Sequence, residues 1–358
     1  MLKKLDLYII RKFLGTFLLS IILILSITVV LDLTEKIDKF YDKHAPLKAI
    51  IFDYYFNFIP FFFNMLYPLF TFIAVIFFTS KMASDSEIIA IQASGVSYNR
   101  MLRPYFISAL LIAMLTFYLG GYAIPKGNKT RLKFENEYVS KFKNENVSNV
   151  QMEVEKGVIL YIESFDANGH NGYHMSMEKF QGKKLVARLT AEQIHYDTLN
   201  KWKVQNYLIR KFDGLKEHIT KGTVLDTTIN IQPEDFFITA YESPQMTNTE
   251  LSSYLKRQRE RGVGNIKAFE DEYYKRFSMP FAAFILTLMG VSLSSRKVRG
   301  GTGVNLGIGL ALSASYVLFS TFSSSFSING SASALFAAWL PNIVFSIIAV
   351  FFYFKAIK

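Results

Sequence analysis

The sequence predicts a membrane α-helical protein in which six transmembrane helices carry an inserted all-β domain, of the β-sandwich, jelly-roll or open-barrel type. Three observations support this fold class. Long apolar stretches gather at both ends of the 358-residue chain, and about 140 polar residues with strand-like alternation separate them. Basic residues are concentrated beside the apolar stretches. The function of the chain must therefore be sought across a bilayer.

Six apolar stretches are long enough to cross the hydrocarbon core, which takes roughly 20 residues as a helix. Three precede the polar region and three follow it. The expected spans run from about residues 13–33, 54–80, 104–124, 277–295, 304–328 and 332–354. The cationic segment before the first span resembles a signal peptide, but the apolar stretch is too long and no small-residue cleavage site follows it. We therefore expect this span to be retained.

The distribution of charge sets the expected orientation. With the N-terminus inside, the cytoplasmic segments hold 12 of the 40 Lys and Arg residues but only three of the 29 Asp and Glu residues. Most of the net charge of +11 then lies on one face, which is the positive-inside pattern of membrane proteins. A nucleic-acid-binding protein would gather its cations on one soluble face, so we expect no nucleic-acid partner.

The polar region is expected to fold on the opposite, exported face of the membrane. Residues 157–165, 184–197, 201–212 and 224–231 alternate apolar and polar side chains at period two, and turn signals separate them. The chain has no cysteine, so this domain has no disulfide. The predicted divisions are an N-terminal transmembrane half at 1–125, the β-domain with a connecting helix at 126–262, and a C-terminal transmembrane half at 263–358.

A short helix is expected in the basic loop between the second and third spans, at about residues 84–95. Ser84 and Glu87 match the S-x-x-E capping box, and Gly95 is a natural helix end. Two interpretations remain open: an interfacial helix that rests on lipid headgroups, or a coupling helix that docks on a cytoplasmic ATPase. The coupling residues would be Ser84, Asp85, Glu87, Ile88, Ile91, Gln92, Ser94 and Gly95.

This loop resembles that of the LptF/LptG permeases, a family formerly called YjgP/YjgQ. The string SEIIAIQASGVS (residues 86–97) follows the second span, and AIPKGN (residues 123–128) follows the third, within a three-plus-three layout. The resemblance covers essentially the whole chain, is closest to LptG-like members, and favours the coupling helix. In that family the acidic residue of the loop helix contacts the ATPase, and it falls on Glu87 here.

The resemblance implies a permease subunit of an ABC transporter that extracts lipopolysaccharide from the Gram-negative inner membrane during outer-membrane biogenesis. It also implies that the inserted domain between the third and fourth spans is a periplasmic all-β jelly-roll-like domain. The implied partners of the subunit are a cytoplasmic ABC ATPase dimer, a paralogous permease subunit, a periplasmic jelly-roll bridge protein, lipopolysaccharide and membrane lipid. A non-transporting scaffold or sensor with an exported β-domain is the alternative.

The chain carries no motif for catalysis or for a cofactor. The phosphate loop G-x-x-x-x-G-K-[ST] is absent, as are H-E-x-x-H and G-x-S-x-G. We therefore expect no enzymatic activity, no cofactor and no metal, with ATP hydrolysis on a separate chain. His170 and His174 lie in a Gly- and Asn-rich segment and are expected to form a hairpin tip rather than a metal site.

A cavity for lipopolysaccharide would need cations near its exported rim to pair with anionic head groups. The candidate substrate-binding residues are Lys36, Lys39, Lys43, Arg131, Lys133 and Arg276. The lysines that follow the first span alternate with acidic residues at helical spacing, so local ion pairs are the competing interpretation. LptG-like members tend to carry a substrate-contacting lysine where Asp32 stands here. Either the contact has moved to Lys36 or Lys39, or this chain handles a different head group.

Small residues recur at every fourth position at the start of the fifth span. They are Gly303, Gly307, Ala311 and Ser315. Such a stripe permits close helix–helix approach in lipid. It could pack within this subunit or form a seam with the partner permease, and the resemblance implies a seam.

Overall fold

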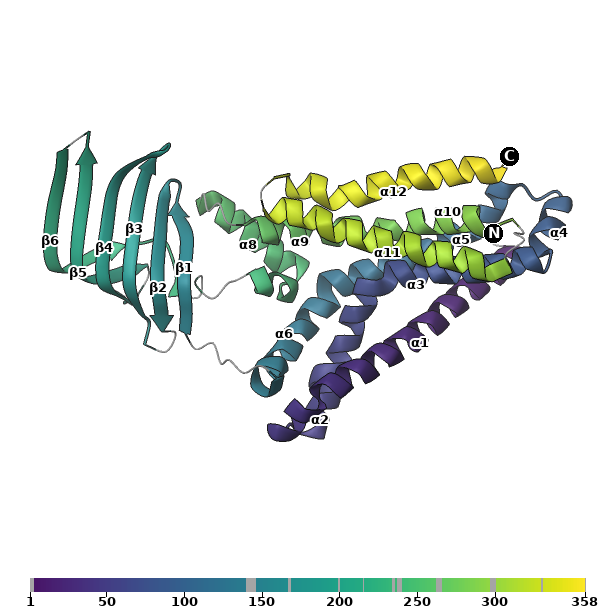
Figure 1. The fold of residues 1–358 in the computed structure, drawn as a ribbon, viewed down its shortest axis with the longest axis horizontal. Coiled ribbons are helices and arrows are strands. Elements are labelled where there is room, and N and C mark those ends of the chain that lie inside the picture. The colour runs from purple at the N-terminus through teal and green to yellow at the C-terminus, as the bar shows by residue number, and fades with distance from the viewer. Residues whose placement is uncertain are drawn as a thin grey trace. The chain divides into compact units, whose positions relative to one another are not determined.

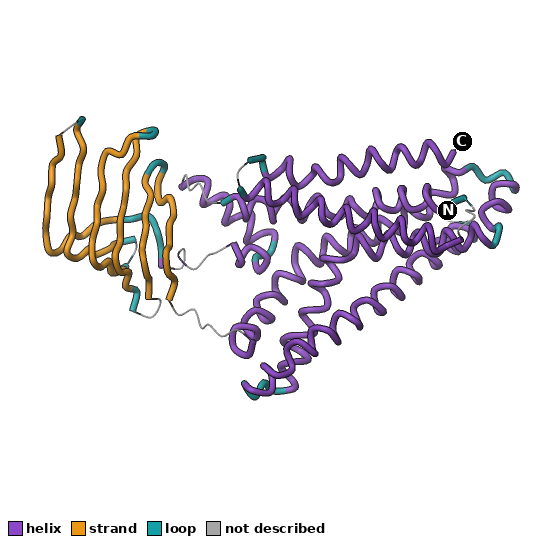
Figure 2. The backbone as a smooth tube through the Cα atoms, viewed as in Figure 1, coloured by secondary structure: helices purple, strands orange, loops and turns teal. Residues whose placement is uncertain are grey.

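The computed structural model describes residues 3–139, 146–166, 169–198, 200–214, 216–233, 236, 240–261, 266–296, 301–329 and 331–357. The chain divides into a helical unit, Met1–Val139 with Glu270–Lys358, and a second unit, Ser140–Phe269, that contains the sheet (Figures 1 and 2). The helical unit extends past the boundary predicted at residue 125, because the third spanning helix continues through the polar residues that follow its apolar stretch.

The six predicted spans are confirmed: among the described residues, six helices are long and apolar enough to cross a membrane (Figure 1). The N-terminal three are composite or long. The first span is α1 (Lys4–Asp42). The second consists of α2 (Leu47–Ala49), a π-helical stretch (Ile50–Tyr55) and α3 (Phe56–Ser84). The third consists of α5 (Tyr98–Tyr118), a π-helical stretch (Leu119–Ala123), α6 (Ile124–Phe134) and a final π-helical stretch (Glu135–Val139). The C-terminal three comprise α9 (Lys267–Ser278), a 3₁₀ turn (Met279–Phe281) and α10 (Ala282–Ser294); α11 (Gly301–Ile328); and α12 (Ala334–Ile357).

The bundle is built around α3, which packs against α1, α10 and α11. Most of the second half of α3 is buried, and glycines on the neighbouring helices let them approach it closely. A Cβ atom on Gly290 of α10 would lie 2.9 Å from Val75, and one on Gly309 of α11 would overlap Ile76. In lipid, where water does not drive helices together, this close contact is what stabilises their packing.

The second unit confirms the predicted inserted β-domain. Its strands form one antiparallel sheet in chain order: β1 (Asn146–Glu155), β2 (Val158–Asp166), β3 (Asn171–Gln181), β4 (Lys184–Tyr196), β5 (Lys201–Asp213) and β6 (Lys216–Thr228). Consecutive pairing makes this sheet a meander, without a Greek-key crossover among the described strands. A 3₁₀ stretch (Ala240–Gln245) and α8 (Asn248–Arg261) follow.

One face of the sheet is buried around Trp202 of β5, which is 1% exposed. Its indole Nε1 donates a hydrogen bond to the carbonyl oxygen of Ile231 at 3.3 Å, and the rings of Phe165 and Phe236 pack against it. The alternating strand pattern is therefore explained by one buried and one solvated face. Most of β6 is exposed, as befits the strand at the edge of the sheet.

The two histidines that were predicted to form a hairpin tip lie in different elements. His170 lies in the turn between β2 and β3, as predicted, whereas His174 lies within β3, so its assignment to the tip is wrong. Its Nδ1 lies 3.2 Å from a carboxylate oxygen of Glu163 on β2. No group of three or more potential metal ligands occurs among the described residues.

Candidate functional site

The short helix α4 (Glu87–Ala93) lies in the connection between α3 and α5, where a helix was predicted. The predicted capping box is wrong, because α3 continues to Ser84 and the turn into α4 begins only at Asp85. Ser86 precedes the helix with a φ of 62°, and its side chain makes no cap hydrogen bond. Gly95 ends the helix as predicted, with a φ of 87° and its N–H bonded to the carbonyl oxygen of Gln92.

The isoleucines of α4 face in different directions. Ile88 is 2% exposed and belongs to the core of the bundle, and Ile91 is partly buried against that core. Ile89, which is not among the predicted coupling residues, is 59% exposed. Of the remaining predicted coupling residues, the structure exposes Ser84, Asp85, Gln92, Ser94 and Gly95. The exposed residues of α4 itself are Ile89, Ala90, Gln92 and Ala93, and Ile88 anchors the helix.

Glu87 is held by α1 rather than by a cap. The phenol of Tyr8 donates its hydrogen toward the carboxylate of Glu87, with O–O distances of 2.9 and 3.2 Å. Two residues before Tyr8, the carboxylate of Asp6 accepts hydrogen bonds from Nη1 and Nη2 of Arg100 on α5, each at 2.6 Å. The first two turns of α1 are thus tied to both α4 and α5. We call this part of the bundle the α4 end.

Neither contact has a signal in the sequence. Tyr8 and Glu87 are 79 residues apart, and Asp6 and Arg100 are 94 residues apart. The sequence of a single chain shows that these residues are polar, but it does not show which of their side chains are in contact.

At the other end of α1, Lys36 lies among polar groups from three segments. Its Nζ lies 2.7 Å from Asp32 Oδ1, one helical turn earlier, and 3.7 Å from Glu135 Oε1. Lys36 also donates a hydrogen bond to the hydroxyl of Tyr54. The Tyr54 and Tyr55 hydroxyls donate in turn to Asp32. This is a local ion pair at helical spacing, but its acidic partner is Asp32 rather than one of the predicted interleaved residues Glu35, Asp38 and Asp42. We call this part of the bundle the α6 end.

The other predicted substrate cations fall into two groups. Lys39 and Lys133 are exposed, and Lys43 is exposed with its Nζ bonded to the Glu137 carbonyl oxygen at 3.2 Å. Arg131 and Arg276 are 8% and 7% exposed, respectively. The guanidinium of Arg131 stacks on the ring of Phe61, 4.2 Å from its centroid, and its Nε has no hydrogen-bond partner among the described residues. Arg276 pairs with Glu272 on its own helix at 2.8 Å.

The small-residue stripe of α11 does not pack within this subunit. Gly303, Gly307, Ala311 and Ser315 are all exposed, and a Cβ on either glycine would meet no described atom within 4 Å. The opposite face of α11 makes the internal contacts instead, through residues such as Asn305, whose side chain donates to Ser80 at 3.0 Å. The alternative of internal packing is therefore wrong.

Comparison with known proteins agrees with this arrangement. The family model described as "Lipopolysaccharide export system permease LptF/LptG" matches residues 7–355. A protein of Rickettsia prowazekii (strain Madrid E), described as "Uncharacterized protein RP871", is 27% identical over 153 residues, which are 40% of this chain and 41% of that protein. The match thus spans less than half the length of that relative. Because the family model covers both sets of membrane helices and the inserted sheet, the chain belongs to the LptF/LptG family of lipopolysaccharide export permeases.

Proposed function

We propose that this chain is a transmembrane subunit of an ABC exporter, which extracts lipopolysaccharide from the inner membrane and passes it to a periplasmic bridge of β-structure. The observation that carries the proposal is the family match over residues 7–355. The chain itself would supply no catalytic group, and a separate cytoplasmic ATPase would hydrolyse ATP.

The charge pattern supports a cytoplasmic α4 end and a periplasmic sheet. Basic residues such as Lys4, Arg11, Arg103 and Arg296 lie at the ends of the apolar helices on that side. The β-domain follows the opposite end of the third spanning helix. In this orientation α4 faces the compartment that contains ATP.

The contacts of α4 suit a helix that transmits motion. Ile88 ties α4 to the core of the bundle, while Ile89 and Gln92 are exposed for contact with the ATPase. Through Tyr8, any displacement of Glu87 reaches the start of α1, a single helix of 39 residues. Because α1 also carries Lys36, closing of the ATPase would move the α6 end relative to α3 and change its affinity for lipid.

The exposed cations of the α6 end are the best candidates for anionic head groups. Lys39 and Lys133 carry charges that reach solvent, whereas Lys36 is neutralised by Asp32 and Glu135. The contact that LptG-like members make with a lysine at the end of the first span would fall to these residues.

Two surfaces would serve assembly. The open stripe of α11, which includes Gly307, suits close packing against a helix of a paralogous permease. The exposed edge strand β6 suits addition of a strand from the bridge protein.

Co-purification in detergent from the native host tests the proposal. Tagged wild-type protein should bring down an ABC ATPase and lipid bearing lipid A, both identified by mass spectrometry. Glu87→Lys should lose the ATPase and keep the lipid, while the matched reversal Glu35→Lys, at an exposed position on α1, should keep both. Tyr8→Phe removes the internal hydrogen bond and leaves the Glu87 carboxylate in place, so it should also keep the ATPase. Recovery of neither ATPase nor lipid A with the wild type would favour a non-transporting scaffold.

A further inference from the structure

The fourth membrane span is interrupted near its middle. The 3₁₀ turn Met279–Phe281 separates α9 from α10, and it contains Pro280. Proline has no backbone N–H with which to continue a helix, and a 3₁₀ stretch inside a helix often marks a hinge. In hydrocarbon, the backbone groups beside such an interruption need partners from other helices. We call Met279–Phe281 the joint.

Side chains from two other helices bond the backbone at the joint. The amide of Asn342 on α12 donates to the carbonyl oxygen of Ser278 at 2.7 Å, and the hydroxyl of Tyr67 on α3 donates to that of Met279. The amide oxygen of Asn342 accepts a hydrogen bond from Tyr316 on α11 at 2.9 Å. All three side chains are buried. We call Tyr67 and Asn342 the latch, because they fix the joint to the rest of the bundle.

The two halves of the span are held in different ways. Ala282, Leu286 and Val291 of α10 are fully buried in the main apolar core of the bundle. Among the described residues, that core includes none from α9. A ring contact joins Phe277 of α9 to Phe117 of α5, with centroids 5.5 Å apart, but Phe277 is 36% exposed. Apolar packing therefore fixes α10 far more firmly than α9.

A buried carboxylate on α9 lacks part of its hydrogen bonding. Asp271 is 4% exposed, and Ser324 and Ser327 of α11 lie beside its side chain, as does Lys275 one turn further along α9. Asp271 Oδ1 and the hydroxyl of Ser327 nevertheless have no hydrogen-bond partner in the described part of the chain. Buried polar groups without partners are rare and costly. A small displacement of α9 that brings these two atoms together would satisfy both.

We propose that α9 has two positions, which exchange about the joint. In the first, the latch is closed and Asp271 Oδ1 is unbonded, as described above. In the second, the bond between Asn342 and Ser278 is broken, α9 tilts toward the end of α11, and Ser327 donates to Asp271. Each position gives up a hydrogen bond that the other makes, so a modest input shifts the balance between them.

The tilt has a consequence for transport, and this consequence rests on the proposed function, whereas the joint itself does not. The chain that leaves the β-domain enters the bundle through α9. The same helix carries Arg276, one of the predicted substrate cations. In a lipopolysaccharide permease, exchange between the two positions would therefore move a candidate head-group contact while α10 stays in the core.

Distances between spin labels on the purified chain, without an ATPase, test the proposal. The chain has no cysteine, so labels can be placed at single introduced cysteines. Tyr274→Cys on α9 with Ile347→Cys on α12 reports the tilt, and we call it the α9 pair. Met114→Cys on α5 with Ile347→Cys is the fixed pair, at two exposed positions outside α9.

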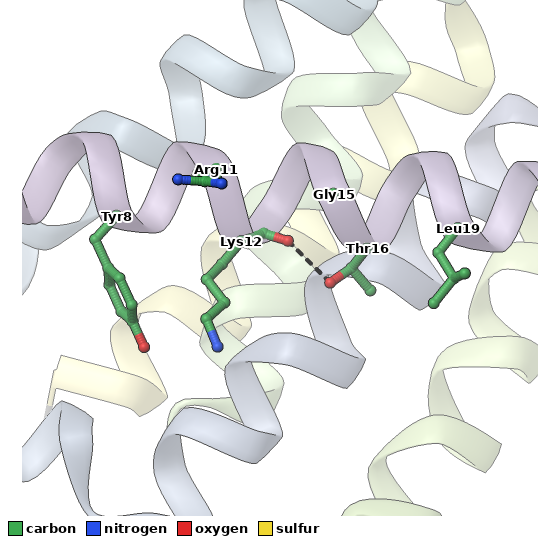
Figure 3. Close-up of a pocket in the computed structure, with 6 residues that line it drawn as sticks. All are labelled: Tyr8, Arg11, Lys12, Gly15, Thr16 and Leu19. Carbon is green, nitrogen blue, oxygen red and sulfur yellow. Dashed lines mark hydrogen bonds between the residues drawn. The ribbon is translucent and has the colours of Figure 1, made fainter.

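The labels also avoid the first span. Figure 3 shows a pocket on the outer surface of α1, lined by Tyr8, Arg11, Lys12, Gly15, Thr16 and Leu19. The family resemblance assigns α1, together with α11, to the seam with a partner permease. Because no label lies on either helix, contact between subunits at that seam does not touch a labelled position.

The α9 pair should give a major and a minor distance, and the fixed pair a single one. Asn342→Leu should raise the minor population about threefold, the size of one side-chain hydrogen bond between membrane helices. Ser327→Ala should lower that population by a similar factor, since it removes the partner of Asp271 in the second position. Asn305→Leu is the matched control: it removes another buried amide, bonded to Ser80 at 3.0 Å on the opposite side of the bundle from α9, and should change neither distance.

The two variants of the joint act in opposite directions, so they separate a shift between positions from general loosening. Ser327→Ala removes only an unbonded hydroxyl and should fold as the wild type does, which keeps the test valid if Asn342→Leu does not fold. One unchanged distance for the α9 pair in the wild type and both variants would overturn the proposal, as would an equal second distance in the fixed pair. Neither result needs an ATPase or lipopolysaccharide, so the proposed function can stand while this inference fails.

Discussion

The carboxylate of Asp32 lies 2.7 Å from the ammonium of Lys36, one turn further along α1, and the hydroxyl of Tyr54 bonds to both side chains. This arrangement bears on the departure from LptG-like members, which tend to have a lysine where Asp32 stands. Lys36 supplies a cation close to that place, but Asp32 offsets its charge. We expect the pair to weaken, rather than provide, the attraction for an anionic head group.

Asp32→Asn should therefore increase lipopolysaccharide binding. The amide keeps the size of the carboxylate and can still accept from Tyr54. Lys36 loses its nearer counter-charge and keeps the more distant Glu135, at 3.7 Å. The expected gain is several-fold, as for one added cation beside an anionic lipid. It is measured as lipid A per protein in the purified complex. Adding Lys36→Met should cancel the gain; a gain that persists in the double variant would show that Lys36 is not the responsible cation.

Asp6 and Arg100 should fix the start of α1 to α5. Asp6 is 2% exposed, and its two oxygens accept the guanidinium of Arg100 at 2.6 Å. Asp6→Asn leaves the fork of Arg100 without its counter-charge, and we expect the midpoint of thermal unfolding in detergent to fall by on the order of 5 °C. Asp38→Asn, at an exposed position on the same helix, is the control. Equal midpoints for the two variants would rule out a structural role for the pair.

The six spans and the inserted strands could be predicted because each depends on a local pattern. Apolar length defines a span, and alternation defines a half-buried strand. The Asp32–Lys36 pair has a spacing that permits contact, since residues four apart on a helix are neighbours. The sequence interpretation of local ion pairs instead involved the interleaved Glu35, Asp38 and Asp42, because spacing shows that an ion pair can form but not which one does.

The capping box at Ser84 failed for a related reason. The S-x-x-E pattern is satisfied equally well by a helix that continues through its serine, and α3 does so. The partners of Glu87 and Asp6 could not be predicted at all, because they depend on how α1 packs against α4 and α5. The direction in which the α11 stripe faces depends likewise on the packing of α3 against Gly309.

Gly307 and Gly309 on α11 should therefore respond differently to the same substitution. A side chain at Gly309 would overlap Ile76 of α3, so Gly309→Leu should prevent the bundle from packing and reduce the yield of folded protein. A side chain at Gly307 meets open space, so Gly307→Leu should leave the single chain folded but block close approach of a partner helix. Size-exclusion profiles and co-purification of the paralogous permease measure both effects. Normal assembly of Gly307→Leu would place the seam elsewhere.

The pair of Arg210 and Glu217 should make the β5–β6 hairpin sensitive to acid. The guanidinium donates hydrogen bonds to Glu217, one of them at 3.0 Å, and holds the pKa of its carboxyl below the ordinary 4.5. A carboxyl with a lowered folded-state pKa stabilises the fold above its unfolded pKa, and that contribution is lost as the pH falls through the folded value. The protection of the β6 amides, corrected for the intrinsic pH dependence of hydrogen exchange, should therefore fall at acid pH in the wild type. The Glu217→Gln variant should lack this loss of protection at acid pH. An identical loss in the variant and the wild type would show that another titrating group causes it.

The hairpin glycines of the sheet give a test of the second unit alone. Gly157, between β1 and β2, has a φ of 80°, and a Cβ there would lie 2.8 Å from the carbonyl oxygen of Phe180. Gly182, between β3 and β4, has a φ of 62° and open space around it. Gly182→Ala should cost about 1 kcal/mol from backbone conformation, and Gly157→Ala should cost more because the strand carrying Phe180 must also shift.

Fluorescence can follow this difference inside the full-length protein. The chain has two tryptophans, so Trp339→Phe leaves the buried Trp202 as a reporter of the sheet. In that background, urea titration should place the midpoint of Gly157→Ala below that of Gly182→Ala, and both below that of the parent. If the two alanine variants unfold together, the approach of Phe180 to Gly157 adds no strain, and the cost at each turn is that of the positive φ alone.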